Sequence, residues 1–115
     1  MDHPEEQVSK AAEFLKALAN PNRLMILCLL LDGEYAVSEL EDRLELRQPT
    51  LSQQLARLRE DKLVETRRDG KQIYYSLASD KVRRTIALLD DMFCSGALAA
   101  GELDHRKDTI LERTG

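Results

Sequence analysis

The sequence has no tryptophan, few aromatic residues (4%) and no long apolar run. Its longest uninterrupted apolar stretch, residues 24–31, is far shorter than the roughly 20 residues that a membrane-spanning helix needs. The opening sequence MDHPEEQVSK is acidic, whereas a signal peptide begins with positive charge. We therefore expect a cytoplasmic protein without a membrane partner.

The motifs of common enzyme classes are also missing. There is no Cys-x-x-Cys pair, which thiol oxidoreductases place at the start of a helix. There is no phosphate-binding loop, no metal-hydrolase motif and no arguable order of Ser, His and Asp for nucleophilic catalysis. We therefore expect a protein that is not an enzyme and that carries no cofactor.

Cysteine is scarce, because the chain contains only Cys28 and Cys94. A permanent disulfide is not expected in a reducing cytosol. A reactive pair and a metal site remain open as alternatives. Two inert thiols are a third alternative, because a free cysteine often fills a core as a small apolar residue.

What is present is a chain of 115 residues, 43% hydrophobic and 33% charged, which suits one compact domain spanning residues 1–115. Leu and Ala dominate its apolar residues, which favours a mainly α-helical fold. The net charge is −4, yet residues 43–71 carry eight Lys or Arg against five Asp or Glu, a local charge of +3. This basic segment favours a nucleic-acid partner.

Apolar residues at helical spacing predict two helices before the basic segment. The first covers residues 11–18, with its apolar side chains on one face. The second covers residues 21–31 and begins with Asn20 as N-cap and Pro21 at the first helical position. It is apolar nearly all round, so we expect it to be central and buried.

A short third helix and a fourth helix are predicted next. The third begins at a capping box of Ser38 with Glu41. The fourth is opened by Gln48 and Pro49, and its inward face consists of Leu51, Leu55 and Leu58. Its opposite face is rich in side chains that form hydrogen bonds: Thr50, Gln53, Ala56 and Arg57, flanked by Ser52 and Gln54.

The spacing then changes from 3.6 to 2, which predicts a β-hairpin over residues 64–77 with Asp69-Gly70 as its two-residue turn. A last helix starts near Ser79 or Asp80. Its apolar stripe consists of Val82, Ile86, Leu89 and Phe93. Residues 97–115 are weakly patterned and are predicted to fray as a tail.

Two short helices followed by a basic hairpin are typical of a winged helix-turn-helix. The predicted fold is mainly α with a small β-hairpin: about five helices plus a two-stranded wing. Short amide and hydroxyl side chains and arginine read base edges, and a basic hairpin tip contacts phosphates or the minor groove. The candidate DNA-binding residues are Gln48, Thr50, Ser52, Gln53, Gln54, Arg57, Arg67, Arg68 and Lys71. The alternative is an ordinary solvated helix face beside an ordinary turn.

The segments ALANPNRLMILCLL and VSELEDRLELRQPTLSQQLARLREDKLVETRRDGKQIYYSL resemble the ArsR family of bacterial transcriptional repressors across residues 17–77. QPTLSQQL corresponds to the recognition helix and RDGKQIYY to the wing. One departure is Gln54, where many members carry histidine. The resemblance implies a homodimer, with the first and last helices packed across the two-fold axis, that binds near-palindromic double-stranded operator DNA.

Many members of this family sense metals, but their ligand positions are empty here. The segment YAVSEL has no cysteine or histidine, the last helix has no histidine, and His3 and His105 lie near the termini. Two thiols without further soft ligands make a poor zinc site. We therefore expect no metal site, although a metal-responsive or metalloid-responsive repressor remains an alternative.

The two cysteines resemble, in location and spacing, the dithiol of the persulfide-sensing branch of the family. The resemblance implies that the second and last helices bring Cys28 and Cys94 together. It also implies that reactive sulfur species join the thiols through a disulfide or polysulfide bridge and so release the operator. A regulator or antirepressor that needs no ligand remains a further alternative.

Overall fold

The computed structural model describes residues 3–44, 46 and 49–94. Its elements are, in chain order, α1 (Pro4–Leu18), α2 (Pro21–Leu29), the short 3-10 helix η1 (Leu30–Asp32), β1 (Tyr35–Ala36), α3 (Val37–Leu44), α4 (Thr50–Glu60), β2 (Val64–Asp69), β3 (Gln72–Leu77) and α5 (Asp80–Cys94). This order confirms the predicted winged-helix class. The predicted tail, residues 97–115, lies outside the described residues.

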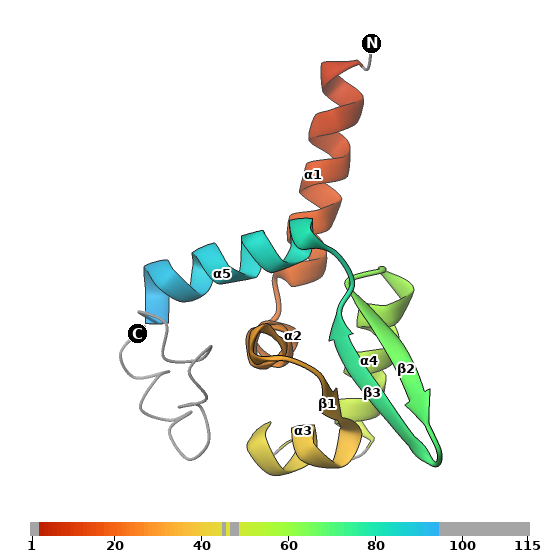
Figure 1. Cartoon of the computed structure of the whole chain (residues 1–115). Helices are drawn as coiled ribbons and strands as arrows, with labels where there is room; N and C mark the ends of the chain where they lie inside the picture. The colour runs from red at the N-terminus through yellow and green to blue at the C-terminus, as the bar shows by residue number, and fades with distance from the viewer. Residues whose placement is uncertain (1–2, 45, 47–48, 95–115) are drawn as a thin grey trace.

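Helix α2 lies at the centre of the molecule, with α5 on one side and α3 on the opposite side, and α4 packs against both α2 and strand β2 (Figure 1). The Asn20 side chain accepts a hydrogen bond from the Arg23 N–H at 3.1 Å, and Pro21 opens the helix, as predicted. The α-helix ends at Leu29, two residues before its predicted end, and continues as η1. Its apolar residues on every side suit this central position.

The core is aliphatic, in keeping with the scarcity of aromatic residues. The largest fully buried side chains are Ile26, Leu27, Leu29, Leu30, Leu40, Leu44, Leu51, Leu55, Leu58 and Ile86. The predicted inward face of α4 is therefore confirmed. No single helix within the described residues is long and apolar enough to cross a membrane; Pro4–Leu18 and Pro21–Asp32 meet the criteria only together, as a pair bent by 90°.

Helix α1 projects away from the rest of the molecule (Figure 1) and begins at Pro4, seven residues before its predicted start. Its first turns are exposed, so they carry no burial pattern that periodicity could detect. Pro4 at the first helical position, with Glu5 and Glu6 in the first turn, accounts for this earlier start.

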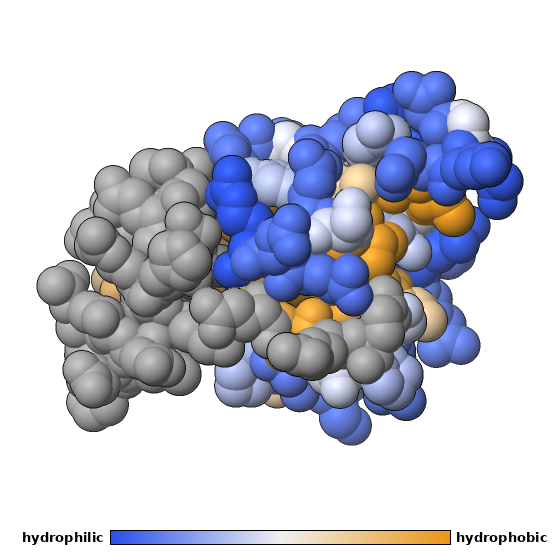
Figure 2. Space-filling view, turned by 90° about the horizontal axis from the view of Figure 1, so that it is seen from below, coloured by the Kyte–Doolittle hydropathy of each residue, from blue (hydrophilic) through white to orange (hydrophobic). Residues whose placement is uncertain are grey.

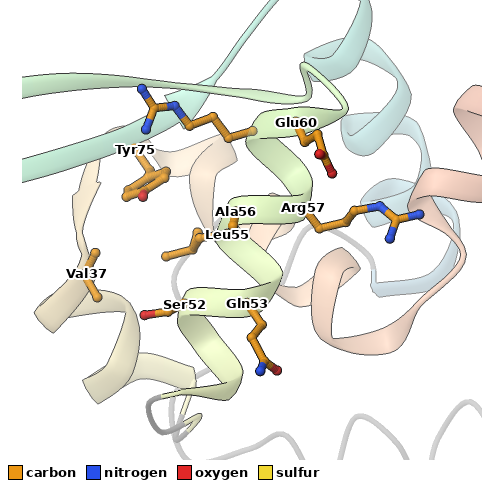
Figure 3. Close-up of a pocket in the computed structure, with 9 residues that line it drawn as sticks. Val37, Ser52, Gln53, Leu55, Ala56, Arg57, Glu60 and Tyr75 are labelled. Carbon is orange, nitrogen blue, oxygen red and sulfur yellow. The ribbon is translucent and has the colours of Figure 1, made fainter.

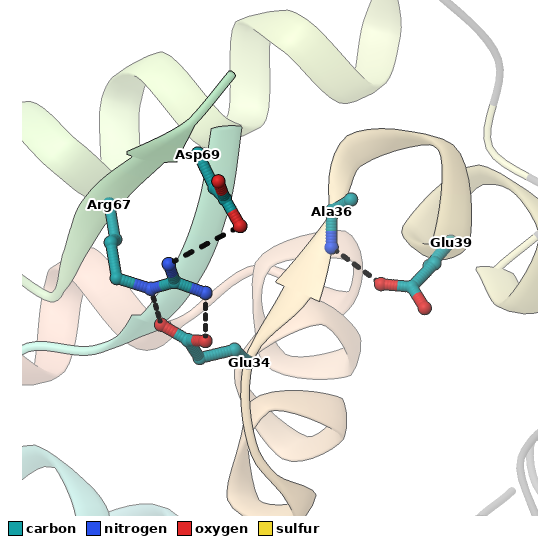
Figure 4. Close-up of polar contacts among 5 residues, drawn as sticks. All are labelled: Glu34, Ala36, Glu39, Arg67 and Asp69. Carbon is teal, nitrogen blue, oxygen red and sulfur yellow. Dashed lines mark hydrogen bonds and ion pairs between the residues drawn. The ribbon is translucent and has the colours of Figure 1, made fainter. Parts of the chain in front are cut away.

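The start of α3 differs from the predicted capping box. A short strand, β1, pairs antiparallel with β3, so the chain stays extended through Ala36 and the helix begins at Val37. The Ala36 N–H donates to Glu39 Oε1 at 2.8 Å (Figure 4). Glu39 therefore caps this helix. The prediction that Ser38 and Glu41 form the capping box is wrong by two residues.

The sheet has the order β1-β3-β2, so the wing has three strands, not two. Asp69 pairs with Gln72, which makes Gly70 and Lys71 the two loop residues; the predicted Asp69-Gly70 turn is wrong by one residue. Gly70 has φ +66°, and Lys71 does not have a positive φ. A glycine with positive φ at the first loop position is typical of a type II′ turn. Lys71 therefore lies at the wing tip.

Helix α5 follows its predicted stripe as far as Leu89, which is partly buried against the core, but not at Phe93. Val82 and Ile86 are buried, but Phe93 is 64% exposed and Asp90 is buried instead. Val82, Ile86 and Asp90 form a series at spacing four, which advances about 40° around the helix axis per step. Because α5 crosses α2, its contact line follows this series, and Phe93 ends off the line.

Candidate nucleic-acid interface and thiol site

The outer face of α4 is polar and exposed, as predicted: Thr50, Ser52, Gln53, Ala56 and Arg57 are all exposed. Gln54 differs, because it is half-buried and its Oε1 accepts a hydrogen bond from Arg23 Nη1 at 3.5 Å. Gln48 lies outside the described residues. The structure thus places five of the six predicted positions between residues 50 and 57 on one solvent-facing surface.

An open groove of about 730 Å³ runs beside α4. Val37 of α3 and Tyr75 of β3 form its far wall, and Ser52 and Gln53 lie along the helix (Figure 3). The Arg57 side chain extends away from Val37 and Tyr75 (Figure 3), and its Nε lies 3.3 Å from Asp61 Oδ2. An exposed ion pair of this kind contributes about 1 kcal/mol or less, so Arg57 can exchange Asp61 for a phosphate.

The wing holds Arg67 in a network of its own. Arg67 donates two hydrogen bonds of 2.9 Å to the carboxylate of Glu34 and lies 4.0 Å from Asp69 (Figure 4). Its guanidinium also lies over the Tyr74 ring, 4.8 Å from the ring centroid. The hydrogen bond from Arg67 lowers the pKa of Glu34. Arg67 therefore ties the wing to the chain before β1.

Arg68 and Lys71 lie at the end of the wing. Both are exposed, and within the described part of the chain neither side chain forms an ion pair. Seen from below, the face that includes α3 and the wing tip is predominantly hydrophilic, with smaller hydrophobic areas between polar ones (Figure 2). Free cations on a hydrophilic face are suited to contacts with phosphates.

The two cysteines lie on helices that pack against each other, Cys28 on α2 and Cys94 at the end of α5. Both are free thiols; Cys28 is 5% exposed and Cys94 is half-buried against the core that contains Cys28. Burial, the charge of Asp90 and Cys94 together raise the pKa of Cys28 to about 12. Burial and Asp90 also raise the pKa of Cys94.

Asp90 is a residue that sequence reasoning missed. It is 3% exposed, and its Oδ1 has no hydrogen-bond partner in the described residues. The signal that could have found it is the series Val82, Ile86, Asp90, which continues at spacing four to Cys94.

No three His, Cys, Asp or Glu side chains are placed to hold a metal ion in residues 3–44, 46 and 49–94. His3 is exposed, and His105 lies outside these residues. Within the described residues, Cys28, Cys94 and Asp90 are thus two thiols and one carboxylate on the packed helices α2 and α5.

The sequence pattern described as "Bacterial regulatory protein, arsR family" matches residues 20–66. The chain is 53% identical over 91 residues to the biofilm growth-associated repressor of Agrobacterium fabrum, covering 79% of this chain and 78% of the relative. It is 50% identical over 90 residues to the transcriptional activator HlyU of Vibrio cholerae, covering 78% of this chain and 83% of the relative.

Solved structures of similar proteins have the same fold as this chain. Reduced HlyU from Vibrio cholerae superposes with a TM-score of 0.75 at 50% identity and covers 78% of this chain and 95% of its own. The transcriptional repressor BigR from Xylella fastidiosa superposes with a TM-score of 0.74 at 46% identity and covers 79% of this chain and 90% of its own. The chain therefore belongs to the ArsR family and is a DNA-binding transcriptional regulator of the winged-helix type.

Proposed function

We propose that the protein is a homodimeric repressor that releases its operator when reactive sulfur species join Cys28 and Cys94 of the same subunit. The observation that carries this proposal is the packing of α2 against α5, which brings the helices of two thiols 66 positions apart into contact. One similar structure is described as reduced HlyU, and two relatives are described as repressors. The word "reduced" supports a regulator with more than one oxidation state, and the word "repressor" supports repression.

Uncovered apolar side chains support the dimer. Val8 and Leu15 of α1, and Leu88, Met92 and Phe93 of α5, are each between 57% and 66% exposed. Large apolar patches on a small protein mark an interaction surface. A second copy that covers α1 and α5 would bury these side chains and place two α4 helices against one duplex.

The DNA contacts are proposed on two surfaces. Gln48, Thr50, Ser52, Gln53 and Arg57 enter the major groove on α4, and Arg68 and Lys71 contact the backbone or the minor groove from the wing. Gln54 and Arg67 reach DNA only when they exchange their partners, Arg23 and Glu34, for it. The polar face of α4 and the unpaired wing cations support this assignment.

The chemistry begins at Cys94, because it is the more exposed thiol. Its thiolate attacks the outer sulfur of a persulfide R–S–SH, which gives Cys94–S–SH, and R–SH leaves with the proton that Cys94 lost. The Cys28 thiolate then attacks the Cys94 sulfur, which forms the disulfide and expels HS⁻; this takes up the Cys28 proton as H₂S. Two thiols are oxidised and one persulfide is reduced to R–SH and H₂S. If a second persulfide first extends Cys94–S–SH to Cys94–S–S–SH, again releasing R–SH, the Cys28 thiolate attacks the sulfur that carries the terminal SH and expels HS⁻, so the bridge is one sulfur atom longer.

The bridge acts on DNA binding through the helices that it joins. In the chain-entropy model, closing a loop of this length contributes roughly 4 kcal/mol, and a few kcal/mol shift a two-state equilibrium strongly. Because α5 carries exposed apolar residues of the proposed dimer contact, strain on α5 changes the relative placement of the two α4 helices. Half-sites one helical turn apart then no longer fit both subunits.

The test measures intact mass and operator affinity together, after treatment with a persulfide, hydrogen peroxide or oxidised glutathione. Persulfide should raise the monomer mass by whole sulfur atoms less two hydrogens, or lower it by two hydrogens for a plain disulfide. No covalent dimer should form, and operator affinity should fall and return with reductant. Cys28→Ser and Cys94→Ser should each stay bound to DNA.

Three outcomes would contradict the proposal. Release from DNA by either single variant would show that the pair is not required. Release by stoichiometric zinc or arsenite in place of persulfide would support a metal-responsive or metalloid-responsive repressor. Unchanged affinity after all oxidants would support a regulator or antirepressor that needs no ligand.

A further inference from the structure

Asp90 is the single buried charged side chain among the described residues. Its Oδ1 is fully enclosed and has no hydrogen-bond partner there, whereas the next residue, Asp91, is exposed. A buried carboxylate oxygen without a partner is unfavourable, and native structures retain few such groups. Packing alone therefore does not explain why a carboxylate is buried at position 90.

The position of Asp90 supplies an explanation. It lies one helical turn before Cys94, on the series of α5 residues that faces the core, and α5 packs against the helix that carries Cys28. The charge of Asp90 acts on both thiols: after burial, it is the next cause that raises the pKa of Cys28 and of Cys94. The three groups form one cluster on two helices.

The other charged groups on the packed elements either contact different partners or, like Arg84 and Asp91 of α5, are exposed. Arg23 of α2 donates to a carbonyl of α1 and to α4, and Asp32 of η1 accepts from a tyrosine hydroxyl. Arg83 of α5 donates to a carbonyl of η1, and Tyr75 of β3 lines the groove beside α4. No cation in the described residues is paired with Asp90, so its charge at the thiols is not balanced.

We propose that Asp90 is a positioning residue of the dithiol, whose carboxylate holds Cys28 and Cys94 in the protonated form and so limits how fast they react. The thiolate is the nucleophile in sulfur transfer, so a charge that disfavours the thiolate slows every electrophile. Only an efficient sulfur donor then oxidises the pair at neutral pH. This inference rests on the proposed function for its biological role, but its test needs neither DNA nor a persulfide.

The test compares thiol reactivity in the reduced full-length protein. Wild type, Asp90→Asn and Asp91→Asn are treated with iodoacetamide between pH 7.5 and pH 10, and the rate at each cysteine is measured by peptide mass spectrometry. Asp90→Asn should react roughly tenfold faster at a fixed pH, which corresponds to one pKa unit. Asp91→Asn removes the same charge from an exposed neighbour and should match wild type.

Folding is checked by circular dichroism and by the rates in urea, where both thiols are fully accessible. If Asp90→Asn does not fold, Asp90→Ser, which is smaller and neutral, takes its place with the same expectation. Equal profiles for the Asp90 and Asp91 variants would overturn the proposal. Loss of folding in both neutral Asp90 variants would also overturn it, because Asp90 would then have a structural role.

The outcomes separate this inference from the proposed function. Faster alkylation of Asp90→Asn, with no operator release from wild type by persulfide, would uphold the role of Asp90 and contradict the sensor. Operator release from wild type by persulfide, with the alkylation rate of Asp90→Asn equal to that of wild type, would support the sensor and contradict the role of Asp90.

Discussion

The wing and the α2–α5 contact each hold a small polar cluster, and the two clusters differ in solvent and in pairing. In the wing, Arg67 meets Glu34 through two hydrogen bonds of 2.9 Å, and both side chains are exposed. Between α2 and α5, Asp90 and Cys28 are buried, and Asp90 has no cationic partner in the described residues. The same protein thus places a balanced pair in water and an unbalanced charge in its core.

Under the proposed function, this difference suits the two clusters to different tasks. Water screens an exposed pair, so its partners can be exchanged for DNA phosphates at little cost. In the core, a charge acts strongly on its neighbours, and the pKa of Cys28 rises to about 12 through burial, Asp90 and Cys94. The wing suits reversible binding, and the buried cluster suits control of thiol chemistry.

The first prediction tests the buried cluster through stability. The pKa of Cys28 is near 9.0 when unperturbed and about 12 in the fold. A thiol whose pKa is raised by folding contributes its full stability below pH 9 and loses it as the pH rises toward 12. Three pKa units correspond to roughly 4 kcal/mol. The free energy of unfolding of wild type should therefore fall more steeply above pH 9 than that of Cys28→Ala.

Urea denaturation in reducing buffer, at intervals from pH 8 to pH 11, measures this difference. Lysines and tyrosines titrate in both proteins, so the difference between the curves isolates Cys28. Cys94→Ala is the matched control: Cys94 is half-buried, so its removal should change the pH dependence less. If the free energy of unfolding fell equally with pH in wild type and Cys28→Ala, burial would not have raised the pKa of Cys28, and the buried cluster would not differ from the exposed one in this respect.

The second prediction tests the exposed surface on α4. Replacing Gln53 and Arg57 by Ala should weaken operator binding by about 3 kcal/mol, more than a hundredfold, because each good base contact contributes about 1–3 kcal/mol. Stability and dimerisation should stay as in wild type, since both side chains are exposed. Fluorescence anisotropy with operator and scrambled DNA measures the effect. Arg84→Ala, which removes an exposed cation from α5, should bind normally; equal losses in both proteins would contradict the assignment.

The periodicity of apolar residues predicted the features that depend on a single helix or a single hairpin. Leu51, Leu55 and Leu58 identified the buried face of α4, and therefore also its exposed face. The hairpin was predicted from alternation and a glycine turn, but the turn lies one residue later because Asp69 pairs with Gln72. A short sequence motif therefore predicts that a turn is present more reliably than it predicts which residues form the turn.

Features that arise where elements meet could not be predicted in the same way. Strand β1 has two residues, too few for a pattern of alternation, and it exists because β3 pairs with it. The burial of Asp90 and the exposure of Phe93 depend on where α5 crosses α2. The pairing of Arg67 with Glu34 joins positions 33 residues apart. Each of these outcomes is set by tertiary geometry, which no single segment encodes.

The third prediction tests whether the balanced pair restrains the wing. Glu34→Gln removes the charged partner of Arg67, so Arg67 becomes available to a phosphate and operator affinity should rise roughly fivefold at low salt. Glu65→Gln is the matched control, because Glu65 is an exposed wing carboxylate and its loss changes the charge equally without freeing an arginine. Anisotropy titrations of both variants measure the difference. Equal affinities would show that only net charge matters.

The last prediction concerns the unpaired cations of the wing, where the expected effect is smallest. Lys71 lies in the loop between β2 and β3, is exposed and forms no ion pair within the described residues. A lysine on one phosphate releases about one counterion, so Lys71→Gln should reduce the slope of log affinity against log salt by about 0.9 and lower affinity roughly threefold. Lys10→Gln on α1 removes the same charge far along the chain from the wing and should keep the wild-type slope. Because a phosphate contact carries no sequence information, operator and scrambled DNA should lose affinity equally. A loss confined to the operator would instead place Lys71 against base edges in the minor groove, and an unchanged slope would show that the wing tip does not touch DNA.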